Sequence, residues 1–161
     1  MTARRPVAVV SGVVTAVPDT DTLYVAPLGT SQDLPAVSGT QATNSTSSVS
    51  AGSILFDPAS FPTSQGNTTR NITFMVLGFA TSGMTAEFTL FNVTDGAVVS
   101  AATLTTSTNS IVSLVSSSLV VPTSLPNSPK LYDVRFRISS GTPGPTDAAV
   151  IRWAGLKVVY S

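Results

Sequence analysis

The chain contains 161 residues and has no net charge at pH 7, and only 10% of its residues are charged, against about 25% in an average globular domain. It has no histidine and no cysteine, which excludes zinc sites built on those residues, cysteine nucleophiles, Ser–His triads and disulfide bonds. The absence of net charge also argues against a general surface for nucleic acid or anionic membranes.

The N-terminal part of the chain divides into two stretches that differ from the rest. Residues 1–25 are expected to form a separate N-terminal β arm, with a strand over residues 7–17, a turn at Pro18-Asp19-Thr20-Asp21 and a second short strand. Residues 26–52 are rich in serine, threonine, glycine and alanine and show little periodicity, which predicts a connector. An arm with exposed strand edges is suited to adding strands to a neighbouring chain.

No segment of the sequence reads as a targeting or membrane-spanning element. The apolar stretch after Arg4 and Arg5 is interrupted by Ser11 and Gly12, so we expect no secretory signal. The longest apolar run, residues 72–80, is far shorter than the roughly 20 residues that span a bilayer.

Residues 53–161 show the period-two alternation of β-strands. Residues 70–80 carry apolar side chains on both faces, which predicts a central strand covered on both sides. Residues 130–139 alternate apolar with polar or charged positions, which predicts a strand with one buried face. In that strand the positions expected inside are Tyr132, Val134, Phe136 and Ile138, and those expected outside are Asp133, Arg135 and Arg137. Further strands are expected at residues 53–56, 84–93, 98–105 and 111–121.

Two local features refine this pattern. The segment Val93–Val98 contains Asp95-Gly96, and Asp-Gly is a favoured pair in tight β-hairpin turns. At the C-terminus, Ala149, Ile151 and Trp153 fall on one face, whereas Leu156, Val158 and Tyr160 are out of phase with them. A β-bulge at Ala154-Gly155 would return both sets to the same face.

Eight or nine short strands separated by turn residues, with almost no helical periodicity, predict an all-β fold. The expected architecture is an antiparallel β-sandwich, jelly-roll-like, over residues 53–161, preceded by the extended N-terminal arm.

The residues that could perform chemistry do not form a recognisable site. Asp19, Asp21 and Asp33 could contribute to a weak calcium site, but a turn explains the first two equally simply and too few oxygen ligands are present. Glu87 is the only glutamate, and no second acid marks a catalytic pair with it. We therefore expect no enzyme activity, no metal and no cofactor.

A few residues are candidates for contacts with partner chains. Arg135 and Arg137 on one strand, with Arg152 and Lys157 on another, could form a basic strip that meets an anionic group, or they could simply be solvated. Trp153, the only tryptophan, is expected in the core or between subunits rather than on a sugar-binding platform. The remaining candidates lie in the arm: Arg4, Arg5, Val9 and Val13.

The arm contains a short element with a known counterpart. Gly12, Val17-Pro18 and Asp21-Thr22-Leu23 stand in an apolar stretch of about 20 residues that resembles an element of bacteriophage fibre and head-appendage proteins. The serine- and threonine-rich remainder is similar in style to small phage decoration, cement or fibre-head domains.

The resemblance implies a virion structural protein without catalytic residues. Within that class it favours a capsid decoration (cement) protein that stabilises the shell, located on the capsid or tail surface and bound to the major capsid protein or tail proteins. We further expect a homo-oligomer, a trimer, and from the balanced charge no binding to nucleic acid or membrane. The alternatives are a tail-fibre or tail-tip adaptor and, from another class, a carbohydrate-binding β-sandwich module.

Overall fold

The structure is a computed structural model that describes residues 7–10, 13–16, 31–65 and 68–160. In these ranges the chain forms strands and one 3₁₀ turn, η1 (Pro58–Ser60). The strands in chain order are β1 (Val7–Val10), β2 (Val13–Ala16), β3 (Ser31–Thr43), β4 (Val49–Phe56), β5 (Ser64–Gln65), β6 (Thr68–Ala80), β7 (Thr85–Asn92), β8 (Ala97–Thr106), β9 (Val112–Val115), β10 (Lys130–Ser140) and β11 (Ala149–Tyr160).

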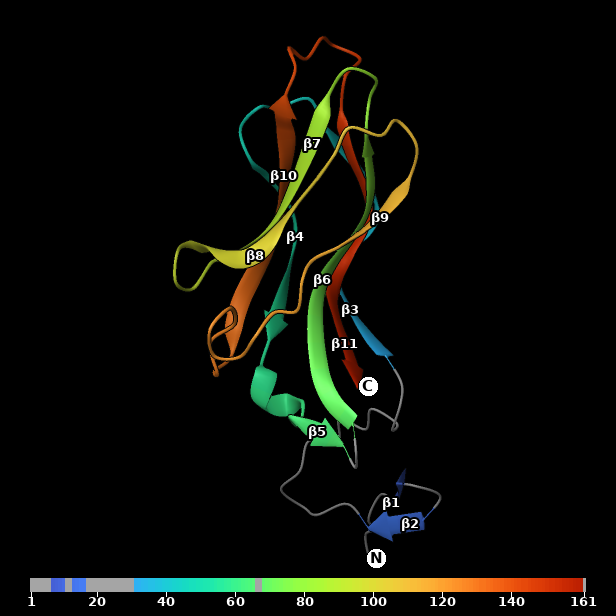
Figure 1. The fold of residues 1–161 in the computed structure, drawn as a ribbon, viewed down its shortest axis with the longest axis vertical. Coiled ribbons are helices and arrows are strands. Elements are labelled where there is room, and N and C mark those ends of the chain that lie inside the picture. The colour runs from blue at the N-terminus through green and yellow to red at the C-terminus, as the bar shows by residue number, and fades with distance from the viewer. Residues whose placement is uncertain (1–6, 11–12, 17–30, 66–67, 161) are drawn as a thin grey trace, which may run out of the picture.

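Nine of these strands form two antiparallel sheets that pack face to face (Figure 1). One sheet has the order β4-β10-β7-β8, and the other has the order β3-β11-β6 with β5 and β9 both paired to β6. When the two-residue β5 is left aside, the other eight strands of the sandwich pair from the outside inward. The first pairs with the last (β3–β11), the second with the seventh (β4–β10), the third with the sixth (β6–β9) and the fourth with the fifth (β7–β8). This is a long hairpin rolled up on itself, and the predicted jelly-roll-like sandwich is therefore confirmed.

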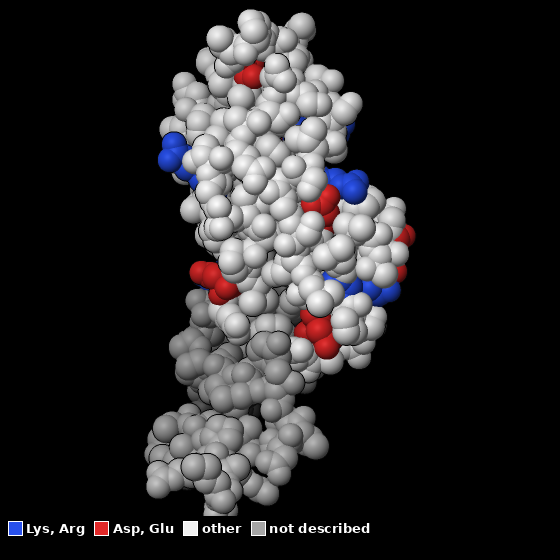
Figure 2. Space-filling view, turned by 180° about the vertical axis from the view of Figure 1, so that it is seen from behind, with Lys and Arg blue, Asp and Glu red and all other residues white. Residues whose placement is uncertain are grey.

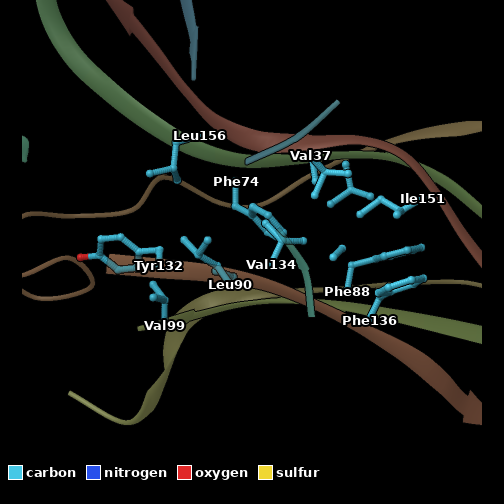
Figure 3. Packing of buried hydrophobic residues seen from close by; sticks show 14 of the residues in the cluster. Val37, Phe74, Phe88, Leu90, Val99, Tyr132, Val134, Phe136, Ile151 and Leu156 are labelled. Atoms are coloured by element: carbon cyan, nitrogen blue, oxygen red, sulfur yellow. The ribbon is translucent and has the colours of Figure 1, made fainter. Parts of the chain in front are cut away.

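The core lies between the two sheets and follows the predicted alternation. Tyr132, Val134, Phe136 and Ile138 of β10 are all buried, as expected. Figure 3 shows side chains of β10 and β7 pointing toward Phe74 of β6 and toward side chains of β11. This burial of apolar side chains supplies the main favourable contribution to folding.

The prediction that residues 70–80 are covered on both sides is wrong. Ile72, Phe74 and Val76 of β6 are buried, but the alternate positions, including Met75 and Leu77, keep partial exposure. The strand is central in its sheet, yet only its inner face meets the other sheet.

The expected connector is also wrong for the part that the structure describes. Residues 31–43 form β3, which pairs along β11, and residues 49–52 open β4. The alternation is hidden in the sequence because the register of β3 against β11 shifts twice, at Ser38–Gln41 and at Pro35–Val37. The sandwich therefore begins at or before Ser31 rather than at residue 53.

The arm is described only in part. Its strand pair is β1 with β2, in a register that pairs Val9 with Val14 and Val10 with Val13, whereas a single strand was expected over residues 7–17. The predicted turn and second strand, residues 18–25, lie outside the described residues.

The hairpin and the C-terminal bulge were both anticipated, although the bulge is displaced. Gly96 has a φ of +70° and its N–H donates to the carbonyl of Asn92 at 2.9 Å, which closes the predicted turn. At the predicted position, Ala154-Gly155, the pairing of β11 with β3 is irregular, but the extra residue there is Ala36 of β3. Within β11 itself the register against both neighbours shifts between Ile151 and Trp153. Arg152 is consequently the extra residue.

Tyr132 gives the first testable prediction. Its hydroxyl is buried and has no hydrogen-bond partner among the described residues, and burial, reinforced by the negative charge of Asp95, raises the pKa of Tyr132 to about 12. Above pH 10 the unfolded chain loses this proton before the folded chain does, so folding stability should fall between pH 10 and 12, by about 3 kcal/mol from this group.

Tyr132→Phe should remove this loss and, at neutral pH, leave the free energy of unfolding unchanged or raised by about 1 kcal/mol. Urea denaturation of both proteins at pH 7 and at pH 11 measures the difference. Equal alkaline losses in the two proteins would show that Tyr132 is not the group responsible.

Candidate interaction surfaces

The sandwich presents two outer faces, one from each sheet, and most candidate residues lie on them. Figure 2 shows that charged side chains are few on the visible side of the molecule and that uncharged surface dominates. The two faces differ in composition, so each is described separately.

The centre of the β4-β10-β7-β8 face is organised around Asp133. Its carboxylate accepts hydrogen bonds from Ser50 Oγ at 2.6 Å, Ser53 Oγ at 3.3 Å and Arg135 Nε at 3.1 Å. Asp133 is buried even though it occupies an outward position of β10. Its neighbours on this outer face cover the carboxylate and satisfy it with hydrogen bonds.

The two arginines of this face are held by neighbours on the same chain. The Arg135 guanidinium lies 3.5 Å from the centre of the Phe91 ring, a cation–π contact. Arg137 Nε lies 2.8 Å from Glu87 Oε1, and this hydrogen bond and charge raise the pKa of Arg137. Each arginine is thus fixed in position and its charge is offset locally.

One end of the same face is apolar. Leu55 of β4 and Leu131 of β10 are directly paired across the strands, and the Val93 N–H donates to the Leu131 carbonyl at 2.9 Å. Val98 of β8 pairs with Phe91, two residues before Val93. We call Leu55, Val93, Val98 and Leu131 the apolar end; their exposed fractions are 71%, 41%, 51% and 39%.

The outer face of the other sheet also carries apolar side chains. Trp153 of β11 pairs with Leu77 of β6, and Met75 of β6 pairs with Val115 of β9. Val115 is 52% exposed, and the other three are partly exposed. Arg152 lies beside them and is exposed.

Trp153 does not occupy the core position that was one of its expected locations. The bulge at Arg152 places Ile151 and Ala154 inside, and Trp153 is left on the partly exposed outer face. The second expected location, between subunits, stays a prediction.

The predicted basic strip does not form. Arg135 and Arg137 belong to β10, whereas Arg152 and Lys157 belong to β11 in the opposite sheet. Because the two sheets pack through their inner faces, these two pairs of outward residues point away from each other.

The arm candidates are described less fully. Val9 and Val13 lie in the paired strands β1 and β2, and Arg4 and Arg5 lie outside the described residues. Contact between a partner chain and any of these four residues stays a prediction.

The sequence reasoning missed the apolar end, although a signal was present. Leu131 has the same strand phase as Asp133 and Arg135, so an outward leucine could have been inferred. Its neighbour Leu55 could not, because it depends on the pairing of β4 with β10.

Within the described ranges, no three acidic residues gather into a group that could hold a metal ion, and no helix is long and apolar enough to cross a membrane. Asp33 is exposed on β3, and the other two residues of the possible calcium site, Asp19 and Asp21, lie outside the described residues.

Comparison with known proteins gives a match only among solved structures. No protein-family model and no curated protein matches the chain. A chain of the T13 particle of infectious bursal disease virus matches with 14% identity and a TM-score of 0.49, covering 96% of this chain and 35% of that one. The VP2 subviral particle of the same virus matches with 14% identity and a TM-score of 0.48, covering 96% and 36%. The present chain spans about a third of the length of these viral chains.

Proposed function

We propose that this chain is a structural protein of a virion and, more specifically, a capsid decoration (cement) protein. In this role it stabilises the shell by binding the major capsid protein on one side and further copies of itself on another. The copies form a homotrimer on the particle surface, and residues 1–25 extend from each copy to a neighbouring subunit.

The observation that carries this proposal is the presence of exposed apolar side chains on both outer faces of the sandwich. Leu55 and Leu131 lie on one face, and Trp153 and Val115 lie on the other. Exposed apolar groups that cluster on a surface mark sites of protein association. A molecule with two such faces can bridge two partners at once, and this bridging is how a cement protein reinforces a shell.

The arm adds a second kind of contact. An isolated two-stranded hairpin is marginally stable in water, and β1 and β2 are only four residues each. Seven of their eight residues are valine or alanine, so a partner surface that buried them would stabilise the pair. The resemblance of the surrounding segment to phage appendage proteins supports the same role.

Deletion of residues 1–25 tests this proposal. All residues of the core cluster lie between Val37 and Tyr160, so the truncated protein should keep its β-sheet circular dichroism and its cooperative melting. We expect its co-sedimentation with virus particles assembled without this protein to fall at least tenfold relative to the full chain.

The double variant Arg4→Ala with Arg5→Ala removes the two charges of the arm but keeps the residues of β1 and β2. It should bind particles more tightly than the deletion variant does. Undiminished binding by the deletion variant would contradict the role of the arm. Binding to isolated tails rather than to shells would instead favour a tail-tip adaptor.

A further inference from the structure

The apolar end, Leu55, Val93, Val98 and Leu131, is the exposed apolar group that the fold leaves least explained. Leu55 and Leu131 are cross-strand neighbours, and such directly opposed apolar pairs normally contribute to packing. Among the described residues both side chains stay exposed on this face, because the layer that packs on this sheet lies against its inner face. A partner chain that covered them would remove this apolar surface from water.

The geometry of the sheet favours contact through its face rather than through its edges. At one edge, Gln41 Nε2 of β3 donates to the carbonyl of Ala51 in β4 at 2.6 Å, which engages part of the β4 backbone. At the other edge, β8 is interrupted by a bulge at which Ala101 adopts a φ of +66°. Both features obstruct the addition of a straight strand, so a partner reaches this sheet by covering its outer surface.

The charges beside the apolar end indicate which partner fits. Lys130 Nζ lies 2.6 Å from Asp95 Oδ1, and Arg135 is paired with Asp133. Arg137 and Glu87 complete the set on this face. This face therefore carries three positive and three negative groups, and each is paired within the chain. The same face of a second copy can approach it without net electrostatic repulsion. A strongly charged partner would gain little from such a surface.

We propose that the apolar end binds the apolar ends of further copies of this chain, with Leu131 at the centre of the contact. Copies related by a rotation axis near Leu131 place apolar side chains against one another, and the ion pairs then lie around the rim. A buried apolar centre within a polar rim is the usual organisation of a stable protein interface. This inference deepens the proposed function by naming the surface through which the copies associate.

Cysteine cross-linking of the purified full chain tests this contact, because the natural sequence has no cysteine. Leu131→Cys should give disulfide-linked pairs of chains under mild oxidation, since residues near a symmetry axis meet their own counterparts. Leu55→Cys provides a second reporter on the same surface. Val120→Cys is the matched control, because Val120 is an exposed apolar residue (53%) outside the apolar end.

We expect the yield of linked chains for Leu131→Cys to exceed that of the Val120→Cys control at least tenfold, at protein concentrations where random collision is slow. Equal yields for Leu131→Cys, Leu55→Cys and the control would overturn the proposal. So would linkage of Leu131→Cys to a particle protein in place of a second copy, because the occupant would then be another protein. No particle is needed for the main result, so a failure of self-association is distinguishable from a failure of shell binding.

Discussion

Replacing Gly155 by valine should disrupt the pairing of β3 with β11 and lower the free energy of unfolding by at least about 3 kcal/mol. A Cβ atom at this position would overlap the backbone carbonyl of Leu34 and lie 3.0 Å from the Cα atom of Pro35. Backbone atoms of a paired strand cannot move aside as the end of a flexible side chain can. The cost therefore falls on the strand pairing itself.

Urea denaturation of the purified variant measures this effect. Gly144→Ala is the control, because the nearest atom to a Cβ there is a carboxylate oxygen of the Asp147 side chain at 3.3 Å. We expect the control to change stability by less than about 1 kcal/mol. A Gly155→Val protein as stable as the control would mean that β3 does not pack closely on β11.

Truncating Phe88 to alanine should destabilise the sandwich by about 3–5 kcal/mol, the usual cost of removing a buried aromatic ring. Phe88 is fully buried in β7, and its ring lies against Gly78 of the opposite sheet, where a Cβ atom would be 2.8 Å from Phe88 Cζ. The glycine makes room for the ring, so the two sheets are fitted to each other at this point.

Thermal and urea unfolding of Phe88→Ala, compared with Ile111→Ala, test this fit. Ile111 is 52% exposed, and its truncation should cost no more than about 0.5 kcal/mol. A difference of less than about 1 kcal/mol between the two variants would be inconsistent with a tightly packed core around Phe88.

Strands with one buried face could be predicted from the sequence because their side chains report the burial directly. In β10 the alternation between Tyr132 and Ile138 is uninterrupted, and the turn at Asp95-Gly96 has a local cause in its backbone conformation. These two features needed no knowledge of distant neighbours.

Features that depend on pairing could not be predicted in the same way. The strand β3 has two register irregularities, at Pro35–Val37 and at Ser38–Gln41, and much of it is exposed. Its sequence, with Pro35 and Gly39 among mostly polar residues, therefore resembles a loop until β11 is seen beside it.

The position of the bulge in β11 also decides which side chains lie on the outer face of its sheet. The C-terminal phase change correctly indicated a bulge, but an irregularity at Arg152 and one at Ala154-Gly155 both bring Ile151 and Leu156 to the same face. Only the position of the bulge decides whether Trp153 is inside or outside. The pairing of Leu55 with Leu131 likewise depends on register, so neither outer face could be assembled from the sequence alone.

The proposed association of this chain with its own copies is tested most directly by its mass in solution. Sedimentation equilibrium of the purified full chain, over a wide range of concentrations, should give a mass three times that of one chain. The double variant Leu55→Ser with Leu131→Ser should shift that mass toward a single chain without loss of β-sheet structure. A natural chain that stays monomeric at the highest concentrations would contradict the account.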